Sequence, residues 1–376
     1  MNHGSIHLMR LFGIPIRIHV SWLIIFFLIT WSLAVGYFPQ QEAYKGWPPH
    51  VYWVAAVVTS LLFFTSVLLH ELAHSLVALS RGMHVRDIVL FVFGGVSEIT
   101  EEPASPGTEF VMTFVGPGMS FLLGGFFYII HGLVAPISQP AGAVAFYLFV
   151  INLMLGFFNL IPGFPLDGGR LLRSIVWAIT GNLQRATWWA VRMGQFISYA
   201  FIFGGIWMVF TPGGAINGLW LAFIGWFLNN AAQASWNQTL IKHALAGHGV
   251  REIMTADFPQ VPPDLSVAAL VDDYILGRGL RSLPVTQDGR LLGLVSVHHI
   301  KNVPLEQRNT TRVSDIMLPA EKLQVTQPDE GLWRALEEMT EEGVNQLPVV
   351  EGERLAGMLR RDAVMGFLRI RAELGG

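Results

Sequence analysis

His70, Glu71 and His74 are three ionisable side chains in a stretch that is otherwise apolar, Leu68-Leu69-His70-Glu71-Leu72-Ala73-His74. On an α-helix, residues four apart lie on one face at roughly 6 Å, a separation that lets two imidazoles bind one zinc ion. Glu71 projects about 100° away, where its carboxylate can act on a water at the metal without being a ligand. The pattern His-Glu-x-x-His therefore predicts two metal ligands and a general base.

A catalytic zinc ion needs a third protein ligand and one open position. The chain has no cysteine, so that ligand must be a His, Asp or Glu side chain. Asp167 is the best candidate, because it ends the segment Asn159-Leu160-Ile161-Pro162-Gly163-Phe164-Pro165-Leu166-Asp167 and is followed by Gly168-Gly169. The two prolines break a helix, and the glycines permit backbone angles that other residues cannot adopt. The competing interpretation is a plain loop, with Asp167 near the N-cap of a helix over 170–180.

Six windows of about 20 apolar residues can supply the helices that position these groups. They cover 19–38, 53–79, 109–131, 143–162, 188–210 and 215–236. The first window is too long for the apolar core of a signal peptide and lacks a small-residue cleavage site after it, so we expect it to remain as a span. The second window contains Glu71, and a carboxylate within a membrane span marks a functional site.

The charged residues divide the chain into two parts. Residues 1–240 carry 9 Lys/Arg and 8 Asp/Glu, whereas residues 241–376 carry 15 and 19. Eleven of the twelve tryptophans lie in the first part, as expected for rings at lipid interfaces. We predict a membrane domain over 1–240 and a linker over 241–249. The net charge of -3 gives no basic surface, which excludes nucleic acid as a partner.

The basic residues of the membrane part lie almost entirely in loops on one side. These are Arg10 and Arg17, Arg81 and Arg86, Arg170, Arg173 and Arg185, and then Lys242, whereas the opposite loops contain only Lys45. Loops rich in Lys and Arg stay in the cytosol. We therefore expect a multi-pass protein of the cell membrane with both termini in the cytosol, as an even number of spans requires.

These residues resemble the site-2 proteases, which are intramembrane zinc metalloproteases of peptidase family M50. The likeness is carried by His70-Glu71-Leu72-Ala73-His74 and by the Asn159-x-x-Pro162-x-x-Pro165-Leu166-Asp167-Gly168 segment about 90 residues later. Three further segments occur in the family's order: Gly13-Ile14-Pro15-Ile16-Arg17-Ile18-His19, Phe93-Gly94-Gly95-Val96 and Gly116-Pro117-Gly118. One position departs from the family, whose members commonly have an asparagine shortly after this Gly-Pro, where the chain has Met119-Ser120.

The resemblance implies that His70, His74 and Asp167 bind one zinc ion. It also implies that Glu71 activates the zinc-bound water and that Asn159 assists binding of the substrate or the transition state. The activity would be hydrolysis of peptide bonds within transmembrane segments of membrane-anchored proteins, known as regulated intramembrane proteolysis. Membrane lipid and such a transmembrane substrate are then the partners.

Two further features of the membrane part allow a functional and a plain interpretation. Residues 85–100 alternate in polarity and turn at Gly94-Gly95, which predicts a hairpin whose edge can pair with an unwound substrate; the alternative is a cytosolic loop. His19, at the start of the first span, is more often an interfacial residue than a ligand.

The last third of the chain contains a repeat of about 60 residues. Val250-Arg251-Glu252-Ile253-Met254 matches Val313-Ser314-Asp315-Ile316-Met317, and Arg281-Ser282-Leu283-Pro284-Val285 matches Asn345-Gln346-Leu347-Pro348-Val349. Each unit predicts an amphipathic helix (266–278; 330–342) and two strands that turn at Asp288-Gly289 or Glu351-Gly352. The units resemble a tandem pair of cystathionine β-synthase (CBS) domains, over 250–306 and 307–376.

This second resemblance implies an adenine nucleotide as ligand and a homodimer formed through the CBS pair. Many members end the last strand with Thr/Ser-x-x-Asp, whose aspartate holds a ribose. Here the segments are Ser296-Val297-His298-His299 and Arg360-Arg361-Asp362-Ala363. The aspartate is replaced in the first repeat and displaced by one residue in the second, so a purely structural or dimerising module is the alternative.

The fold class predicted is a polytopic α-helical membrane protein, with about six transmembrane helices, followed by an α/β tandem CBS domain pair. Two functions compete with proteolysis. The first is a CBS-regulated membrane metal transporter, which generally needs ligands along a route through both leaflets, whereas the candidates here cluster at the cytosolic side. The second is an inactive membrane scaffold, against which the intact His-Glu-x-x-His and Asp167 argue.

Metal analysis tests the ligand assignment directly. We expect one zinc ion per purified parent chain and markedly less zinc in His70→Ala and in Asp167→Ala, because each variant removes one of three ligands. Unchanged zinc in Asp167→Ala would remove Asp167 from the ligand set.

Overall fold

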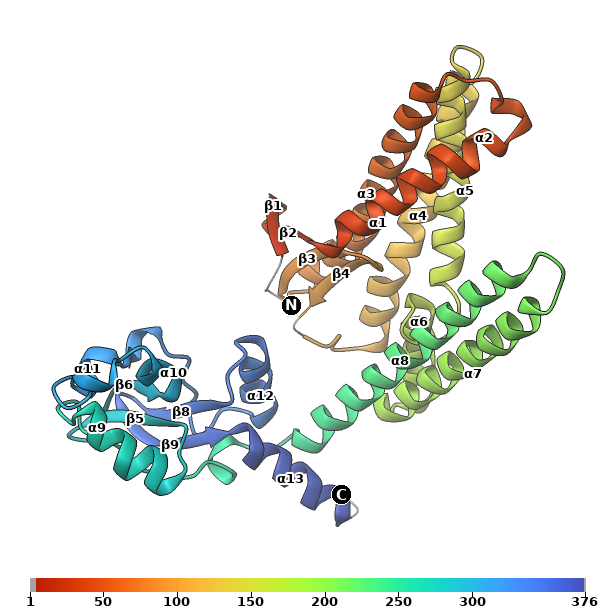
Figure 1. The fold of residues 1–376 in the computed structure, drawn as a ribbon. Coiled ribbons are helices and arrows are strands. Elements are labelled where there is room, and N and C mark those ends of the chain that lie inside the picture. Colours follow the sequence, from red (N-terminus) through yellow and green to blue (C-terminus); the bar gives the residue numbers. More distant parts are fainter. Residues whose placement is uncertain (1–4, 100, 375–376) are drawn as a thin grey trace. The chain divides into compact units, whose positions relative to one another are not determined.

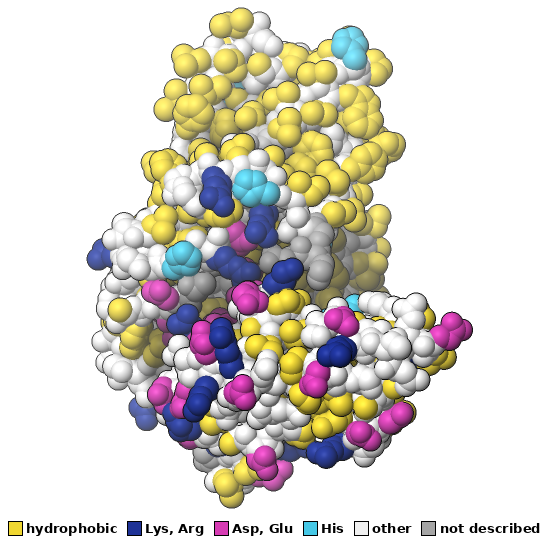
Figure 2. All heavy atoms as spheres, turned by 90° about the vertical axis from the view of Figure 1, so that its left-hand side faces the viewer, with side chains coloured by type: hydrophobic (Ala, Val, Ile, Leu, Met, Phe, Trp, Pro, Cys, Tyr) yellow, Lys and Arg dark blue, Asp and Glu magenta, His cyan; other side chains and the backbone are white. Residues whose placement is uncertain are grey.

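The computed structural model describes residues 5–99 and 101–374. They form two compact units, Met1–Asn237 and Gln238–Gly376, referred to below as the N-terminal and C-terminal units (Figure 1). The helix α8 (Ala215–Leu245) begins in the first unit and ends in the second. Figure 2 shows that hydrophobic side chains crowd one part of the visible surface, whereas acidic and basic side chains intermingle over another.

Four helical stretches among the described residues are long and apolar enough to cross a membrane. They are Ser21–Gln40, which comprises α1 (Ser21–Trp31), a π-helical segment (Ser32–Tyr37) and α2 (Phe38–Gln40), then α3 (Pro49–Ser80), α4 (Pro106–Val134) and α5 (Gln139–Asn159). These stretches coincide with the first four predicted windows. The last two windows are helical, in α7 (Leu183–Val209) and α8, but neither is among the four stretches, so the total of six spans stays a prediction.

Buried polar side chains join the apolar helices to one another. Thr30 donates a hydrogen bond to the Ser60 hydroxyl at 2.9 Å, which ties α1 to α3. The Asn152 amide on α5 donates to the Ser66 hydroxyl on α3 at 3.3 Å. In lipid, where apolar surface alone gives no drive for association, such bonds and close packing hold helices together. They place α3, the helix with the His-Glu-x-x-His pattern, between α1 and α5.

A four-stranded sheet packs against the C-terminal half of α3. Its strands β1 (Ser5–Leu11), β2 (Ile14–His19), β3 (Val85–Phe91) and β4 (Gly94–Ile99) lie in that order. β1 and β2 are antiparallel, β2 and β3 are parallel, and β3 and β4 form an antiparallel hairpin. Ile16 pairs with Ile88, and both side chains are fully buried. Ile88 packs with Leu72, Ala78 and Met112 in the cluster between the sheet, α3 and α4.

The hairpin predicted over 85–100 is present, but its turn was wrongly placed. Gly94 pairs with Phe91 as the first residue of β4, so the turn consists of Val92 and Phe93 instead of Gly94-Gly95. Gly94 has a positive φ of 126°, a backbone angle that suits glycine at a strand end. Thr100, the last residue of the predicted segment, lies outside the described residues.

The C-terminal unit contains an antiparallel sheet with strand order β5-β6-β9-β8, and β7 pairs with β6. The strands are β5 (Ser282–Gln287), β6 (Arg290–Ser296), β7 (Leu318–Pro319), β8 (Gln346–Glu351) and β9 (Arg354–Arg360). The helices are α9 (Val267–Ala269), a π-helical segment (Leu270–Leu276), α10 (Val297–Lys301), α11 (Val313–Ile316), α12 (Leu332–Glu341) and α13 (Arg361–Glu373). Two hydrophobic clusters form its core, and each repeat contributes to both: the cluster centred on the first repeat includes Val313, and the cluster centred on the second includes Val250.

The internal repeat is visible in the strand registers. Both hairpins carry a bulge at the same place, after Val285 in the first and after Val349 in the second. The first turn is Asp288-Gly289 as predicted, with both φ angles positive. The second turn lies one residue later than predicted, because Glu351 still pairs with Arg354 at the end of β8.

Candidate metal centre

Three side chains converge between α3 and α6 (Asp167–Thr180). One ligand atom from each of His70, His74 and Asp167 lies within 4.8 Å of the others. The Oδ2 atom of Asp167 is 3.1 Å from Nε2 of His70 and 3.2 Å from Nε2 of His74. The two Nε2 atoms are 3.2 Å apart. The structure thus brings together the three residues predicted as ligands, from positions about 95 residues apart.

The remaining nitrogen of each imidazole is held by α4. Nδ1 of His74 is 2.7 Å from the Met112 carbonyl oxygen, which can only accept, so Nδ1 carries the hydrogen and, in the neutral imidazole, Nε2 has the lone pair for a metal. Nδ1 of His70 is 2.9 Å from the Ser120 hydroxyl, which can accept in the same way. Such partners fix the ring orientation and the tautomer of metal-binding histidines.

Gly116 lets α4 approach the histidines this closely. It lies between Met112 and Ser120 on the same helix, and a Cβ atom added there would be 2.8 Å from Nε2 of His70 and closer still to Nε2 of His74. Any side chain at this position would occupy the space between the two ligand nitrogens. The Gly-Pro pair of the third apolar helix is therefore part of the site.

Asp167 is the first residue of α6, and Leu166 occupies the N-cap position without a side-chain cap. The sequence interpretation of Gly168-Gly169 was wrong, since neither glycine has a positive φ. Their role is close packing: a Cβ atom at Gly168 would strike the Leu160 backbone, and one at Gly169 would strike the backbone around Gly163. The loop between α5 and α6 folds tightly over the helix start and presents the aspartate to α3.

Glu71 points towards the hairpin. Its Oε2 atom accepts a hydrogen bond of 3.0 Å from the Ser97 hydroxyl on β4. Ser75, one turn further along α3, donates to Ser97 at 3.0 Å. The two hydroxyls thus form a chain that ends on the carboxylate. Ser97 was not recognised in the sequence, because a serine in a short strand gives no signal of its own.

A cavity of about 300 Å³ opens beside the three ligand residues. His70, Glu71 and Asn159 contribute its polar lining, and the hairpin residues 92–95 form another wall. The rest is apolar and comes from α1, α3 and α5: Ile25, Ile29, Phe63, Phe64, Val67 and Leu155. Asn159 lies at the end of α5, and its amide donates to the Leu155 carbonyl at 3.0 Å. The cavity gives a substrate access to Glu71 and to one side of the metal-binding group.

His19 takes no part in this group. Its Nδ1 atom lies 2.8 Å from the Ser21 hydroxyl and accepts from the Ser21 backbone N–H at 3.2 Å, at the junction of β2 and α1. An interfacial position of His19 stays a prediction.

The donor set fits zinc. Two imidazoles and a carboxylate with an open fourth position are the usual protein ligands of a catalytic zinc ion. Bonds of about 2.0–2.1 Å in a tetrahedron place donor atoms roughly 3.3 Å apart, close to the 3.1–3.2 Å found among His70, His74 and Asp167. Three facing lone pairs at these distances repel one another unless a cation or a proton lies among them.

Comparisons with known proteins give the family. The model of peptidase family M50 matches residues 58–141 and 135–203, and the CBS domain model matches residues 250–306 and 313–370. A candidate zinc metalloprotease of Mycobacterium tuberculosis, Rip3, is 36% identical over 359 residues, which cover 94% of this chain and 90% of Rip3. This chain belongs to peptidase family M50.

Two other proteins are similar to this M50 protease. A candidate zinc metalloprotease of Synechocystis, sll0528, is 32% identical over 378 residues, which cover 98% of this chain and 97% of its own length. The solved site-2 protease from Methanocaldococcus jannaschii is 28% identical, with a TM-score of 0.44, and the match covers 62% of this chain and 95% of that one. By its family models, its two relatives and its four long apolar helices, the M50 protease is a membrane enzyme of the zinc metalloprotease class with a tandem CBS pair.

Ser120 gives a test of the imidazole orientation. We expect Ser120→Ala to weaken zinc binding by about 10- to 100-fold, because the His70 ring loses the partner that holds its tautomer. The measurement is competition with a calibrated chelator in detergent micelles. Ser198→Ala is the matched control, since Ser198 is a fully buried serine on α7 that bonds to its own helix. Equal zinc affinity in the two variants would contradict the role of Ser120.

Proposed function

We propose that this M50 protease hydrolyses peptide bonds within the transmembrane segments of membrane-anchored proteins, as in regulated intramembrane proteolysis. One observation carries the proposal: His70 and His74 of an apolar helix converge with Asp167 beside a cavity that also contains a carboxylate outside this group, Glu71, and an amide, Asn159. A transporter has no need of a base next to its ligands, and a scaffold has no need of the ligands.

The depth of His70, His74 and Asp167 below the end of α3 supports cleavage inside the membrane. α3 ends at Ser80, and His74 lies about six residues before it, or roughly 9 Å along the helix. We infer from the distribution of Lys and Arg that this end of α3 faces the cytosol, as do both termini. The bond that is cut would then lie in the cytosolic part of the substrate's span, and the released fragment would include the substrate's cytosolic region.

The residues of the chain divide the chemistry among themselves. Zinc, when bound, supplies Lewis-acid chemistry that polarises a peptide carbonyl and makes water a better nucleophile. Glu71 takes the proton from the attacking water and passes it to the leaving amine. Ser97 holds the carboxylate of Glu71 in place for both transfers. Asn159, on the cavity wall, donates a hydrogen bond to the developing oxyanion.

The substrate has to enter this cavity in an extended form. A helix keeps its carbonyl groups hydrogen-bonded, so the segment to be cut must unwind first, which favours substrates with weak helix formers at that depth. β4 supports this step, because it is an edge strand of its sheet and its Gly94 and Gly95 line the cavity. An unwound segment can pair with that edge while its carbonyl faces Glu71.

Glu71→Gln tests the proposal. The amide keeps the size of the side chain but cannot accept the proton, so we expect processing of a membrane-anchored substrate to fall by about 10²-fold or more. Zinc content and expression should match the parent. The measurement is release of a tagged cytosolic fragment in cells or proteoliposomes. Zinc flux into vesicles that persists in Glu71→Gln would favour the transporter, and unchanged processing would contradict hydrolysis by this site.

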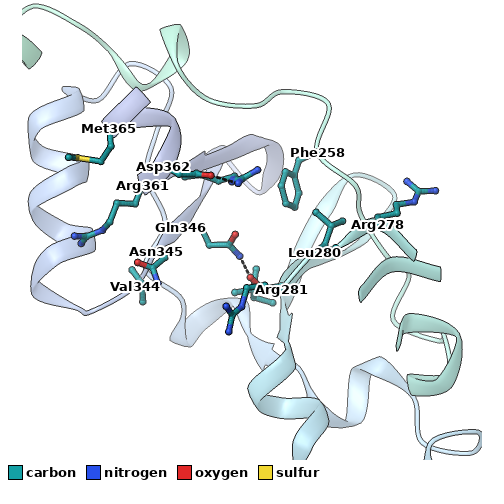
Figure 3. Close-up of a pocket in the computed structure, with 14 residues that line it drawn as sticks. Phe258, Arg278, Leu280, Arg281, Val344, Asn345, Gln346, Arg361, Asp362 and Met365 are labelled. Carbon is teal, nitrogen blue, oxygen red and sulfur yellow. Dashed lines mark hydrogen bonds and ion pairs between the residues drawn. The ribbon is translucent and has the colours of Figure 1, made fainter. Parts of the chain in front are cut away.

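A second proposal concerns the CBS pair, whose repeats enclose a cavity of about 850 Å³ (Figure 3). Arg278 and Arg281 from the first repeat and Arg361 from the second line it, which suits phosphate groups. Phe258 and Met365 add apolar surface for a base. Asp362 is an ion-pair partner of Arg360, which lines the same cavity. We infer that an adenine nucleotide binds here and regulates the protease; a homodimer through these domains stays a prediction.

Calorimetric titration of the full chain in detergent with ATP, ADP and AMP tests the nucleotide proposal. We expect saturable binding of at least one of them, weakened about tenfold or more in Arg281→Ala through loss of a charged contact to phosphate. Arg334→Ala is the control, because Arg334 is exposed on α12 and bonds to Glu330. Absence of saturable heat with all three nucleotides would leave the CBS pair as a structural module.

A further inference from the structure

Glu109 is a fully buried carboxylate that the proposed chemistry does not use. It lies in the first turn of α4 and is 0% exposed. Its Oε1 atom accepts a hydrogen bond of 2.7 Å from Nε of Arg173 on α6 and contacts Nη2 of the same guanidinium. Nε of Arg170, one turn earlier on α6, is 3.9 Å from Oε1. The Arg173 guanidinium also lies over the Phe164 ring, 5.4 Å from its centroid. Two cations and one anion thus meet where α4 and α6 cross.

The buried ion pairs of Glu109 with Arg173 and Arg170 are not explained by stability alone. Removing charges from water costs free energy, and a buried ion pair often gives no more stability than two well-packed apolar side chains. Both guanidinium contacts go to Oε1 of Glu109, and its Oε2 atom is buried without a hydrogen-bond partner. What an ion pair adds over apolar packing is direction, since its hydrogen bonds form in only one registration of the two helices.

The face of α4 that carries Glu109 is the face that holds the two imidazoles. Glu109, Met112, Gly116 and Ser120 follow one another at spacings of three, four and four residues, and they therefore form one stripe along the helix. Met112 and Ser120 bind the Nδ1 atoms, and Gly116 abuts the Nε2 atoms. The stripe thus contacts α3 through Met112, Gly116 and Ser120, and it contacts α6 through Glu109.

On α6 the anchored residues stand close to the third ligand. Arg170 and Arg173 follow Asp167 by three and six residues, about 4.5 and 9 Å along the helix axis. The segment that precedes Asp167 is an irregular loop over 160–166. A loop alone places a helix start poorly, whereas an ion pair in the second turn fixes both the rotation of α6 and its position along α4.

The geometry points to Glu109 and Arg173 as positioning residues that set the distance between the Asp167 carboxylate and the imidazoles of His70 and His74. This inference rests on the proposed zinc site. Neither residue touches the ligand atoms, and both act through α6. The pair makes the third ligand part of a preformed site, so that zinc does not have to draw the aspartate into place.

Zinc affinity of the full-length protein in detergent micelles tests the inference. We expect Glu109→Gln to weaken zinc binding by about 10- to 100-fold, the range for outer partners of metal ligands. Asp87→Asn is the matched control. Asp87 is also buried, pairs with Arg17 at 3.2 Å and has one oxygen without a partner, but it lies in β3. The zinc affinity of Asp87→Asn should equal that of the parent protein. An equal loss in both variants would show a general effect of removing a buried charge and would overturn the inference.

Repeating the Glu109→Gln substitution in the Asp167→Ala variant separates positioning of Asp167 from other effects on zinc affinity. In Asp167→Ala, where the two histidines alone hold the metal, adding Glu109→Gln should change zinc affinity by less than about twofold. A further tenfold loss there would mean that the pair acts elsewhere, and the inference would fall. If Asp167→Ala itself binds zinc like the parent, the proposed ligand set fails instead, which is a distinct result.

A further variant keeps the inference testable if Glu109→Gln fails to fold. If Glu109→Gln does not yield folded protein, the double variant Glu109→Leu/Arg173→Met replaces the ion pair by apolar side chains of similar volume. We expect it to unfold at a temperature near that of the parent without zinc, yet to bind zinc 10- to 100-fold more weakly, the range for outer partners of metal ligands. Parental zinc affinity in a folded double variant would overturn the inference.

Discussion

Mutual repulsion of electron pairs is the constraint on which the rest of this structure depends. Nε2 of His70, Nε2 of His74 and Oδ2 of Asp167 face one another at 3.1–3.2 Å, each from a different turn or helix. Such a cluster persists only where surrounding contacts hold it and a cation or a proton lies among the three atoms. The Met112 carbonyl, the Ser120 hydroxyl and the packing of Gly116 supply those contacts, and all three belong to α4.

Helix α3 separates two tasks by direction. The histidines point towards α4 and α6 and are only 4% and 7% exposed. Glu71 points towards β4 and the cavity, where Ser97 holds it. The carboxylate therefore faces the cavity while the imidazoles are almost fully buried. A spacing of one residue, about 100° of helix rotation, is enough to give two environments to neighbouring side chains.

The sequence predicted the parts of the site that one helix or one motif determines. His70 and His74 follow from a four-residue spacing within α3, and Asp167 follows from a broken segment with two prolines. Met112, Ser120, Ser97, Glu109 and Arg173 did not emerge as parts of the site, because their roles depend on how α4, β4 and α6 are aligned against α3. Periodicity within a helix shows which residues share a face but not how far that helix is shifted along its neighbour.

Two errors in the sequence interpretation have the same origin. The hairpin turn was placed at Gly94-Gly95 because glycine favours turns, yet strand pairing extends to Gly94 and moves the turn to Val92-Phe93. Gly168 and Gly169 were explained by unusual backbone angles, whereas the structure uses them for contact with residues 160–163. In both cases the interpretation rested on the conformational freedom of glycine alone. The partner strand and the neighbouring loop, which determine where the glycines lie, are not visible in the local sequence.

The parallel pairing of β2 with β3 constrains how the enzyme is made. Parallel strands cannot be joined by a tight turn, and here the connection between them consists of α1, α2 and α3. During synthesis, β2 has no partner on its β3 side until the whole of α3 has left the ribosome. The sheet beside Glu71 therefore closes only after these helices have been made, and Asp167 emerges later still. The cluster of His70, His74 and Asp167 is thus incomplete until nearly half of the polypeptide has been translated.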